Sequence, residues 1–242
     1  MGIGVFLTGT DTGVGKTAVT AALARQFHRR GVSVGVMKPV ETGVAGNAPE
    51  QSDAFHLATA AATHDDMELI APFRFQQPVA PLAAARNASQ TIDQSTIVRN
   101  YQAIAHRHHI TLVEGVGGLL VPIGDRWDVR DLIVELKLPV IVVGRSALGG
   151  INHARLTMEA LHSRDIRIIA LVLNQIPPIT SALERDQTET TCRLLRNLLS
   201  EPVLGPLSYV EGMADNWPQS VDRLADDPAI SALAELIFGM PS

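Results

Sequence analysis

The sequence has a single cysteine, Cys192, among its 242 residues, so no disulfide can form within the chain. Structural disulfides belong to oxidising compartments, and a chain without one is typical of the reducing cytoplasm. Cys192 lies in a stretch with helical character, so we interpret it as a buried core residue and not as a catalytic thiol. We expect a cytoplasmic protein.

Long apolar runs and an excess of positive charge are also missing. No stretch approaches the ~18 apolar residues of a membrane-spanning helix, and the short N-terminal apolar segment lacks the basic flank of a signal peptide. The net charge is −5, which disfavours binding to nucleic acid or to an anionic membrane through bulk charge. We expect neither partner, and any anionic ligand must be held by local features.

Apolar residues make up 46% of the chain and charged residues 19%, which argues against disorder and allows one large hydrophobic core. Short apolar strands alternate with helical stretches. We predict strands at residues 3–8, 33–37, 110–113, 140–143 and 166–173, and helices at residues 17–30, 95–107, 129–136 and 153–163. Nearly unbroken Val, Ile and Leu strands separated by helices predict an α/β fold, a mostly parallel sheet with helices on both faces.

We expect this fold to form a single domain over residues 1–242. Between residues 43 and 91 the pattern weakens and prolines accumulate, so we interpret this region as an elaborated set of loops and helices near the functional site. In a parallel sheet the carboxyl ends of the strands share one edge, where ligands bind. The loops that follow Leu7, Met37 and Val113 are therefore expected to converge.

A glycine-rich loop follows the first predicted strand and opens a helix. Residues 9–17 read Gly-Thr-Asp-Thr-Gly-Val-Gly-Lys-Thr. This is the context of a nucleotide-binding P-loop, whose backbone amides and helix N-terminus surround phosphate groups. In such a loop Lys16 reaches the terminal phosphates and the Thr17 hydroxyl is a ligand of Mg²⁺. The loop has one residue more between its first glycine and the Gly-Lys pair than the usual motif.

Two further positions predict a nucleotide site. Glu114 follows an apolar strand and can hold Mg²⁺ directly or through water. Proteins specific for guanine carry an Asn-Lys-x-Asp run, whereas Asn174 is followed by Gln175 and Ile176, with neither Lys nor Asp in place. ATP is therefore favoured over GTP, and Asn174 is expected to hydrogen-bond the adenine edge.

Taken together, these motifs resemble those of the dethiobiotin synthetases. The resemblance includes the loop at 9–17 with its additional residue, Lys-Pro-Val-Glu-Thr-Gly at 38–43, Ser-Asp-Ala at 52–54, Val-Glu-Gly-Val-Gly-Gly at 113–118 and Gly-Gly-Ile-Asn-His-Ala at 149–154. It extends from the N-terminus to Asn174. The resemblance implies a P-loop fold and a cyclo-ligase of biotin biosynthesis that joins CO₂ to 7,8-diaminononanoate with ATP and Mg²⁺, giving dethiobiotin, ADP and phosphate.

The resemblance also implies roles for individual residues. Lys38 and Lys16 are the expected catalytic residues, which offset the charge of a substrate carbamate and of the γ-phosphate. Thr17, Asp53 and Glu114 are the expected Mg²⁺ ligands. The ATP site is expected to include Gly13, Val14, Gly15, Lys16, Thr17, Ala18, Asp53, Glu114, Gly115, Val116, Gly117, Asn174, Gln175, Ser208, Tyr209 and Val210. The placement of the last three residues beside the adenine is looser.

Substrate contacts are expected from Thr12, Lys38, Thr42, Gly150, Ile151 and Asn152. Gly150, Ile151 and Asn152 precede a predicted helix, where free amides can hold the substrate carboxylate, and Asn152 is also a candidate N-cap. In the family this segment comes from a second subunit, which implies a homodimer with a shared site. Many relatives carry Glu where this chain has Gly13, so one side-chain contact to the nucleotide is expected to be missing.

Three other classes of protein share parts of this pattern. Partitioning and septum-positioning ATPases of the MinD and ParA type are nucleotide switches with this fold, but they carry an additional lysine early in the loop, which is absent here. Other amidoligases of the same fold, such as the cofactor a,c-diamide synthases, need a glutamine-hydrolysing domain. A dinucleotide oxidoreductase has no role for the Gly-Lys-Thr run.

Overall fold

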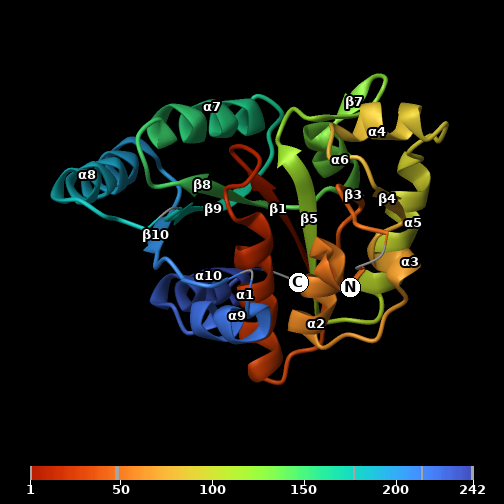
Figure 1. The fold of residues 1–242 in the computed structure, drawn as a ribbon, viewed down its shortest axis with the longest axis horizontal. Coiled ribbons are helices and arrows are strands. Elements are labelled where there is room, and N and C mark those ends of the chain that lie inside the picture. The colour runs from red at the N-terminus through yellow and green to blue at the C-terminus, as the bar shows by residue number, and fades with distance from the viewer. Residues whose placement is uncertain (1, 47–48, 177, 214, 241–242) are drawn as a thin grey trace.

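A computed structural model describes residues 2–46, 49–176, 178–213 and 215–240. Its centre is a six-stranded sheet with the order β10-β9-β8-β1-β5-β2, in which every described pair of neighbours is parallel (Figure 1). The strands are β1 (Ile3–Gly9), β2 (Val34–Met37), β5 (Ile110–Gly118), β8 (Val140–Arg145), β9 (Ile168–Asn174) and β10 (Val203–Leu207). Most of their residues are buried, as the continuous apolar runs predict for a sheet covered on both faces.

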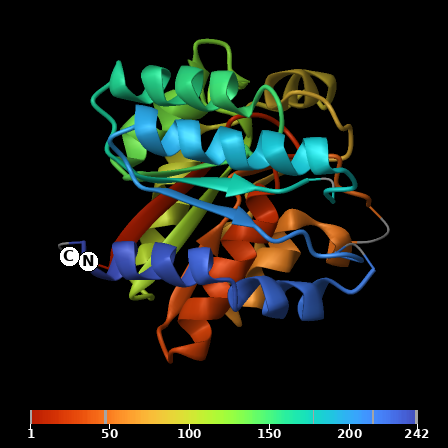
Figure 2. The same cartoon turned by 90° about the vertical axis from the view of Figure 1, so that its left-hand side faces the viewer.

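Helices cover the two faces of the sheet, and Figure 2 shows this layering. Helices α1 (Lys16–Arg29), α2 (Asp53–Ala61), α9 (Trp217–Ala225) and α10 (Pro228–Phe238) pack on one face around Leu7, Leu23 and Phe27. Helices α5 (Gln94–Ala105), α6 (Val129–Leu136), α7 (Gly150–His162) and α8 (Ala182–Leu198) pack on the other face around Phe6, Val113 and Val142. Successive residues of β1 alternate between these two cores, as a strand requires.

Short elements fill the region between β2 and α5. They are β3 (Val40–Thr42), η1 (Pro49–Gln51), α2, α3 (Met67–Ile70), β4 (Phe73–Phe75) and α4 (Pro81–Asn87). Strands β3 and β4 pair in parallel, apart from the main sheet. Two further short strands, β6 (Pro122–Gly124) and β7 (Trp127–Asp128), form an antiparallel pair before α6. Residues 47–48 of the expected loop-and-helix region lie outside the described residues.

The predicted α/β class and parallel sheet are confirmed, and α6 has the predicted bounds. Helix α1 ends at Arg29, one residue before the predicted end, and Gly31 follows with a positive φ of 74°. Cys192 is buried in α8. No helix among residues 2–46, 49–176, 178–213 and 215–240 is long and apolar enough to cross a membrane.

Two boundaries differ from the sequence prediction by three or more residues, and one strand was missed. Strand β5 does not end before Glu114 but continues to Gly118, because Gly118 still pairs with Gly9. Helix α7 begins at Gly150 and not at His153, because Gly149 takes the left-handed cap conformation with φ 88°. Strand β10 was not predicted, since its Gly205 and Pro206 are unfavourable inside a strand; it lies at the edge of the sheet, where a proline costs no ladder hydrogen bond.

Candidate active site

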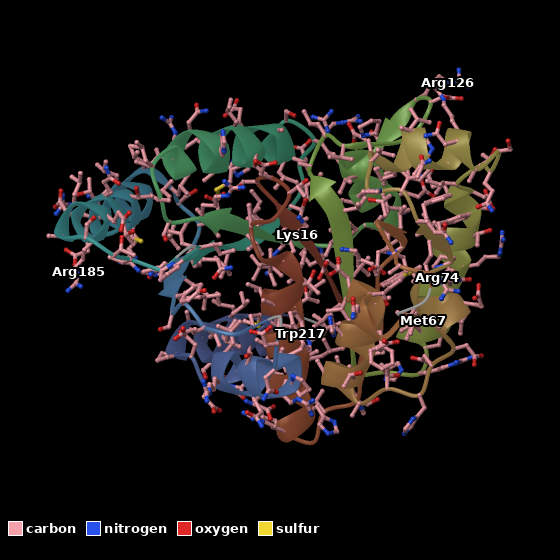
Figure 3. All side chains as sticks on the ribbon, viewed as in Figure 1. Lys16, Met67, Arg74, Arg126, Arg185 and Trp217 are labelled. Carbon is pink, nitrogen blue, oxygen red and sulfur yellow. The ribbon has the colours of Figure 1, made fainter. Side chains whose placement is uncertain are left out.

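Three segments meet at the carboxyl edge of the sheet and bring charged side chains together. Lys16 opens α1 directly after the P-loop, Lys38 follows β2, and Glu114 lies on β5 between them. Lys16 lies near the middle of the molecule, at the end of α1 beside the sheet (Figure 3). The expected convergence of these loops is confirmed by direct contacts between their side chains.

Lys38 is almost completely buried and is held by two carboxylates. Its Nζ lies 2.5 Å from Oε1 of Glu114 and 2.9 Å from Oδ2 of Asp53, and it donates to the carbonyl of Gly115 at 3.3 Å. Burial alone would lower the pKa of Lys38, but the attraction of Glu114 and Asp53 outweighs it and raises that pKa above its ordinary value. Lys38 is therefore a permanently charged cation inside the protein.

Lys16 is also buried, but its surroundings act in the opposite direction. Burial and then the repulsion of Lys38 lower its pKa from 10.5 to about 8, against the weaker attraction of Glu114, Asp53 and Asp11. Among residues 2–46, 49–176, 178–213 and 215–240, its Nζ donates only to the carbonyl of Asp11, at 3.1 Å. The ammonium of Lys16 thus lacks the countercharge that Lys38 has, and an anion in the loop would supply it.

Glu114 is fully buried, and one of its two oxygens is left without a partner. Oε1 accepts from Lys38 and from the Thr17 hydroxyl at 2.8 Å, whereas Oε2 is buried and accepts no hydrogen bond from any residue that the structure describes. An unpaired buried carboxylate oxygen is costly unless a cation or a donor satisfies it. Asp53 lies beside Lys38 and Thr17. Burial raises the pKa of Asp53, but the attraction of Lys38 outweighs it, and the pKa is lowered overall.

These three side chains offer the oxygen ligands that Mg²⁺ prefers. Within the described part of the chain, no group of three or more His, Cys, Asp or Glu side chains is placed to hold a metal ion. A metal between Glu114, Asp53 and Thr17 would therefore take its remaining ligands from phosphate oxygens or water, which is the usual coordination of Mg²⁺ in nucleotide sites.

The P-loop has the backbone that its glycines permit. Gly13 and Gly15 have φ angles of 69° and 88°. A Cβ on Gly15 would lie 2.1 Å from Nδ2 of Asn174, which itself donates to the carbonyl of Val14 at 3.0 Å. Asn174 thus fixes the loop from β9. A Cβ on Gly13 would meet nothing within 4 Å, but the φ of 69° disfavours any residue other than glycine there.

Two adjoining cavities contain most of the predicted site residues. The larger, of about 510 Å³, is lined by Gly15, Thr17, Ala18, Asp53, Asn174, Gln175, Ser208, Tyr209 and Val210 among others. The smaller, of about 330 Å³, is lined by Thr12, Gly13, Gly15, Lys16, Thr17, Lys38, Thr42, Asp53, Val116 and Gly117 among others. Gly15, Thr17 and Asp53 border both, so the phosphate loop lies where the two cavities meet.

The segment Gly150, Ile151 and Asn152 is placed elsewhere. None of the three is among the described residues that line the two cavities. Because α7 begins at Gly150, Asn152 lies in the first turn of the helix, and the interpretation of Asn152 as an N-cap is wrong. Within one chain, the structure does not bring this segment together with Lys38.

Several residues of the site were not predicted from the sequence. Met213 and Trp217 line the larger cavity, and Glu41 lines the smaller one. Trp217 stacks on His56 of α2, with ring centroids 4.2 Å apart. Glu41 belongs to the motif at 38–43, but its spacing gave no indication of its contacts. Trp217 follows a segment without regular periodicity, so no sequence signal placed it.

Comparison with known proteins gives the family. A family model described as an AAA domain matches residues 3–216. A protein named ATP-dependent dethiobiotin synthetase from Thermodesulfovibrio yellowstonii is 38% identical over 219 residues, which cover 87% of this chain and 90% of that protein. The protein of the same name from Bacillus velezensis is 36% identical over 96% of this chain and 97% of its own length. The chain belongs to the ATP-dependent dethiobiotin synthetase family.

Solved structures with the same fold come from more distant proteins. The MinD cell division protein of Aquifex aeolicus superposes with a TM-score of 0.55 at 15% identity, over 99% of this chain and 98% of that one. A ParA family ATPase from Chlorobium tepidum gives a TM-score of 0.53 at 15% identity, over 98% and 99% of the two chains. At this identity the likeness shows the P-loop α/β fold and nothing more.

The opposite environments of the two lysines give a prediction for stability. Without a nucleotide, Lys16 is charged at pH 7 in a fold that disfavours its charge, because its folded pKa of about 8 is below the unfolded value of 10.5. Lys16→Met should therefore stabilise the nucleotide-free protein at pH 7, by up to roughly 3 kcal/mol. The gain should shrink as the pH rises from 8 to 10.5, where wild-type Lys16 loses its proton in the folded state.

Urea unfolding at pH 7 and pH 10 measures this difference. Lys38→Met is the matched control, since it leaves Glu114 and Asp53 without their buried cation and should destabilise the protein by about 3–5 kcal/mol. If both variants lost stability equally at pH 7, the difference between the two lysine environments would be contradicted.

Proposed function

We propose that this chain is an ATP-dependent ligase that makes dethiobiotin from 7,8-diaminononanoate and CO₂, with release of ADP and phosphate. Family membership supports this activity. The single structural observation that carries it is the pair of buried lysines beside the P-loop, one of them already bound by carboxylates and the other lacking a countercharge. Two cations at one sheet edge are suited to a reaction in which two anions must meet.

The proposed chemistry balances in three steps. A substrate amine attacks CO₂ and loses a proton, which gives a carbamate. A carbamate oxygen then attacks the γ-phosphorus of ATP, and ADP leaves, which gives a carbamic-phosphoric anhydride. The second amine attacks the carbonyl carbon and loses a proton, phosphate leaves, and the ureido ring closes. No protein nucleophile is needed, so catalysis rests on positioning and charge stabilisation.

In this proposal Lys38 and Lys16 are the catalytic residues. Lys38 carries its charge at any ordinary pH and lies on the wall of the smaller cavity, where it can bind the carbamate and a γ-phosphate oxygen. Lys16 binds the β- and γ-phosphates from the P-loop, and the triphosphate restores its full charge. Together they offset the repulsion that two anions would otherwise experience at contact distance.

Thr17, Asp53 and Glu114 are the proposed ligands of Mg²⁺, and the unpaired Oε2 of Glu114 supports this assignment. When bound, the ion would neutralise part of the charge on the phosphate oxygens. The same carboxylates hold Lys38 in the structure described here, so Lys38 exchanges at least one of them for a substrate oxygen during the reaction.

The two cavities divide the substrates between them. The larger accommodates the nucleoside, with Asn174, Gln175 and the run Ser208, Tyr209 and Val210 around the base. The phosphates lie on the amides of Gly13, Val14, Gly15, Lys16, Thr17 and Ala18, with Gly115, Val116 and Gly117 close by. The smaller cavity accommodates the diamine, with Thr12 and Thr42 as polar contacts.

The carboxylate of the diamine is assigned to a second copy of the chain. Gly150, Ile151 and Asn152 form the first turn of α7, and its cap residue Gly149 supplies no side-chain acceptor. The amide of Gly150 donates to the carbonyl of Ala147 at 2.9 Å, so the amides of Ile151 and Asn152 are the ones proposed to hold the carboxylate. Leu148 and Leu156 beside this turn are 82% and 61% exposed, which fits a surface covered by a partner. We therefore propose a homodimer with a site shared across its interface. The use of ATP and the single buried cysteine support a cytoplasmic location.

A nucleotide-switch ATPase of the MinD or ParA type has the same fold, but only the fold supports it. The P-loop lacks the additional lysine of those proteins. The two functions differ in what triggers ATP turnover. A ligase hydrolyses ATP only with the diamine and bicarbonate present, whereas a switch turns over without the diamine and responds to DNA or lipid.

Loss of the Lys38 ammonium tests the proposed mechanism. Lys38→Ala should retain ATP binding, since the P-loop and the larger cavity are intact, and should lose at least about a hundredfold in kcat for dethiobiotin formation. Calorimetry with a non-hydrolysable ATP analogue and a phosphate-release assay measure the two quantities separately. Near-normal kcat in Lys38→Ala would remove this residue from the mechanism.

Mixed dimers test the shared site. Lys38→Ala and Asn152→Asp should each be nearly inactive, because Asp at 152 repels the substrate carboxylate. Refolded together, half of the dimers are mixed and each keeps one intact site, so about one quarter of the wild-type activity should return. Each variant refolded alone is the control. Absence of recovery in the mixture, with mixed dimers demonstrated by mass, would mean that each site takes Lys38 and Asn152 from the same chain, and would contradict a site shared across the interface.

A further inference from the structure

Helix α2, which begins at Asp53, has a complete set of acceptors for the amides of its first turn. The amide of Phe55 donates to Oγ of Ser52 at 3.2 Å, and the amide of His56 donates to the carbonyl of Ser52 at 3.1 Å. The first two amides donate elsewhere. Asp53 N lies 2.5 Å from Oε1 of Glu41, and Ala54 N lies 3.2 Å from Oε2 of the same side chain.

Glu41 thus caps the helix from a different segment of the chain. It lies on β3, three residues after Lys38, and is 6% exposed at the wall of the smaller cavity. A helix N-terminus attracts a carboxylate, which offsets part of the cost of burying one. Burial, and then the repulsion of Asp53, nevertheless raises the pKa of Glu41, although the two capping bonds act in the opposite direction. Keeping Glu41 charged at this position therefore costs stability.

The 38–41 segment holds Asp53 at two points. Lys38 binds its carboxylate at 2.9 Å, and Glu41 binds its backbone amide. In the proposed reaction Lys38 exchanges carboxylates for substrate oxygens, which removes the first of these contacts. The contact to Glu41 does not involve the side chain of Asp53 and remains when Lys38 moves.

We propose that Glu41 is a positioning residue, which holds the backbone of Asp53 so that its carboxylate stays in the metal site when Lys38 turns to the substrate. This inference rests on the proposed function, because it assigns Asp53 to Mg²⁺. Glu41 acts through Asp53 and is not a metal ligand itself, since both of its oxygens are already bonded to backbone amides.

A purely structural role as a helix cap makes a different prediction, and Ser52 provides the matched control. The Ser52 hydroxyl caps the same helix through Phe55 N, whereas the amide of Asp53 donates to Glu41 and not to this hydroxyl. Ser52→Ala removes one capping bond and leaves Asp53 held. Glu41→Ala removes the two bonds that hold Asp53 and Ala54. Glu41→Gln keeps one acceptor for the Asp53 amide and loses the other.

The decisive quantity is the factor by which saturating Mg²⁺ tightens binding of a non-hydrolysable ATP analogue, measured by calorimetry with and without the ion. Glu41→Ala should reduce this factor about tenfold or more, in line with other groups that orient a metal ligand. Its affinity for the analogue without Mg²⁺ should be unchanged. Ser52→Ala should lose stability to urea and keep the wild-type factor, and Glu41→Gln should fall between wild type and Glu41→Ala.

Equal factors in Glu41→Ala and Ser52→Ala would overturn the inference and leave Glu41 as a helix cap. Should Glu41→Ala fail to fold, Glu41→Met takes its place, because it keeps the length of the side chain and removes both acceptors, and a wild-type factor in Glu41→Met would overturn the inference equally. The measurement needs no turnover, so it is separate from the proposed activity. The wild-type protein could form no dethiobiotin while Glu41→Ala still reduces the factor by which Mg²⁺ tightens binding of the analogue. That pair of results would refute the proposed function and leave this inference intact.

Discussion

The ion pairs that buried Lys38 makes with buried Glu114 and with the partly exposed Asp53 hold the functional groups of the site together. Glu114 lies on β5, Lys38 directly follows β2, and Asp53 is the first residue of α2. The three meet because parallel strands end at one edge of the sheet. A buried ion cluster of this kind adds little net stability, since the cost of removing charges from water offsets their attraction. Its presence is better explained by chemistry that needs a fixed cation.

The two lysines differ in how their positive charge is stabilised. Lys38 is charged before any ligand binds, because Glu114 and Asp53 stabilise its ammonium group. Lys16, by contrast, has a lowered pKa and a single carbonyl partner, so its charge is stabilised only when phosphate enters the loop. The site is thus prepared for two anions in different ways. MinD and ParA ATPases share the fold, but function is set by such side chains and not by the fold.

Sequence patterns predicted the parts of the structure that local chemistry determines. The P-loop between β1 and α1 follows from glycines and an apolar strand, and the meeting of Lys38 and Glu114 follows from strand parallelism. The start of α7 was misplaced because a pair of glycines permits either a loop or a left-handed cap, and tertiary packing chose the cap. Strand β10 was missed because its stability comes from pairing with β9, a contact that no local pattern encodes.

The role of Glu41 could not be predicted for a related reason. Its partners are backbone amides of residues 53 and 54, and backbone donors have no signature in a sequence. Trp217 reaches the larger cavity only through the packing of α9 against α1 and α2. In both cases the residue type alone is compatible with many surroundings, so the contact becomes visible only in three dimensions.

Structure determination with 7,8-diaminononanoate, bicarbonate, Mg²⁺ and a non-hydrolysable ATP analogue shows whether Lys38 contacts both anions at once. We expect Nζ of Lys38 within hydrogen-bond distance of both a carbamate oxygen and a γ-phosphate oxygen, with Asp53 and Glu114 turned to the metal. A Lys38 still bonded only to its two carboxylates, with the diamine bound elsewhere, would contradict it.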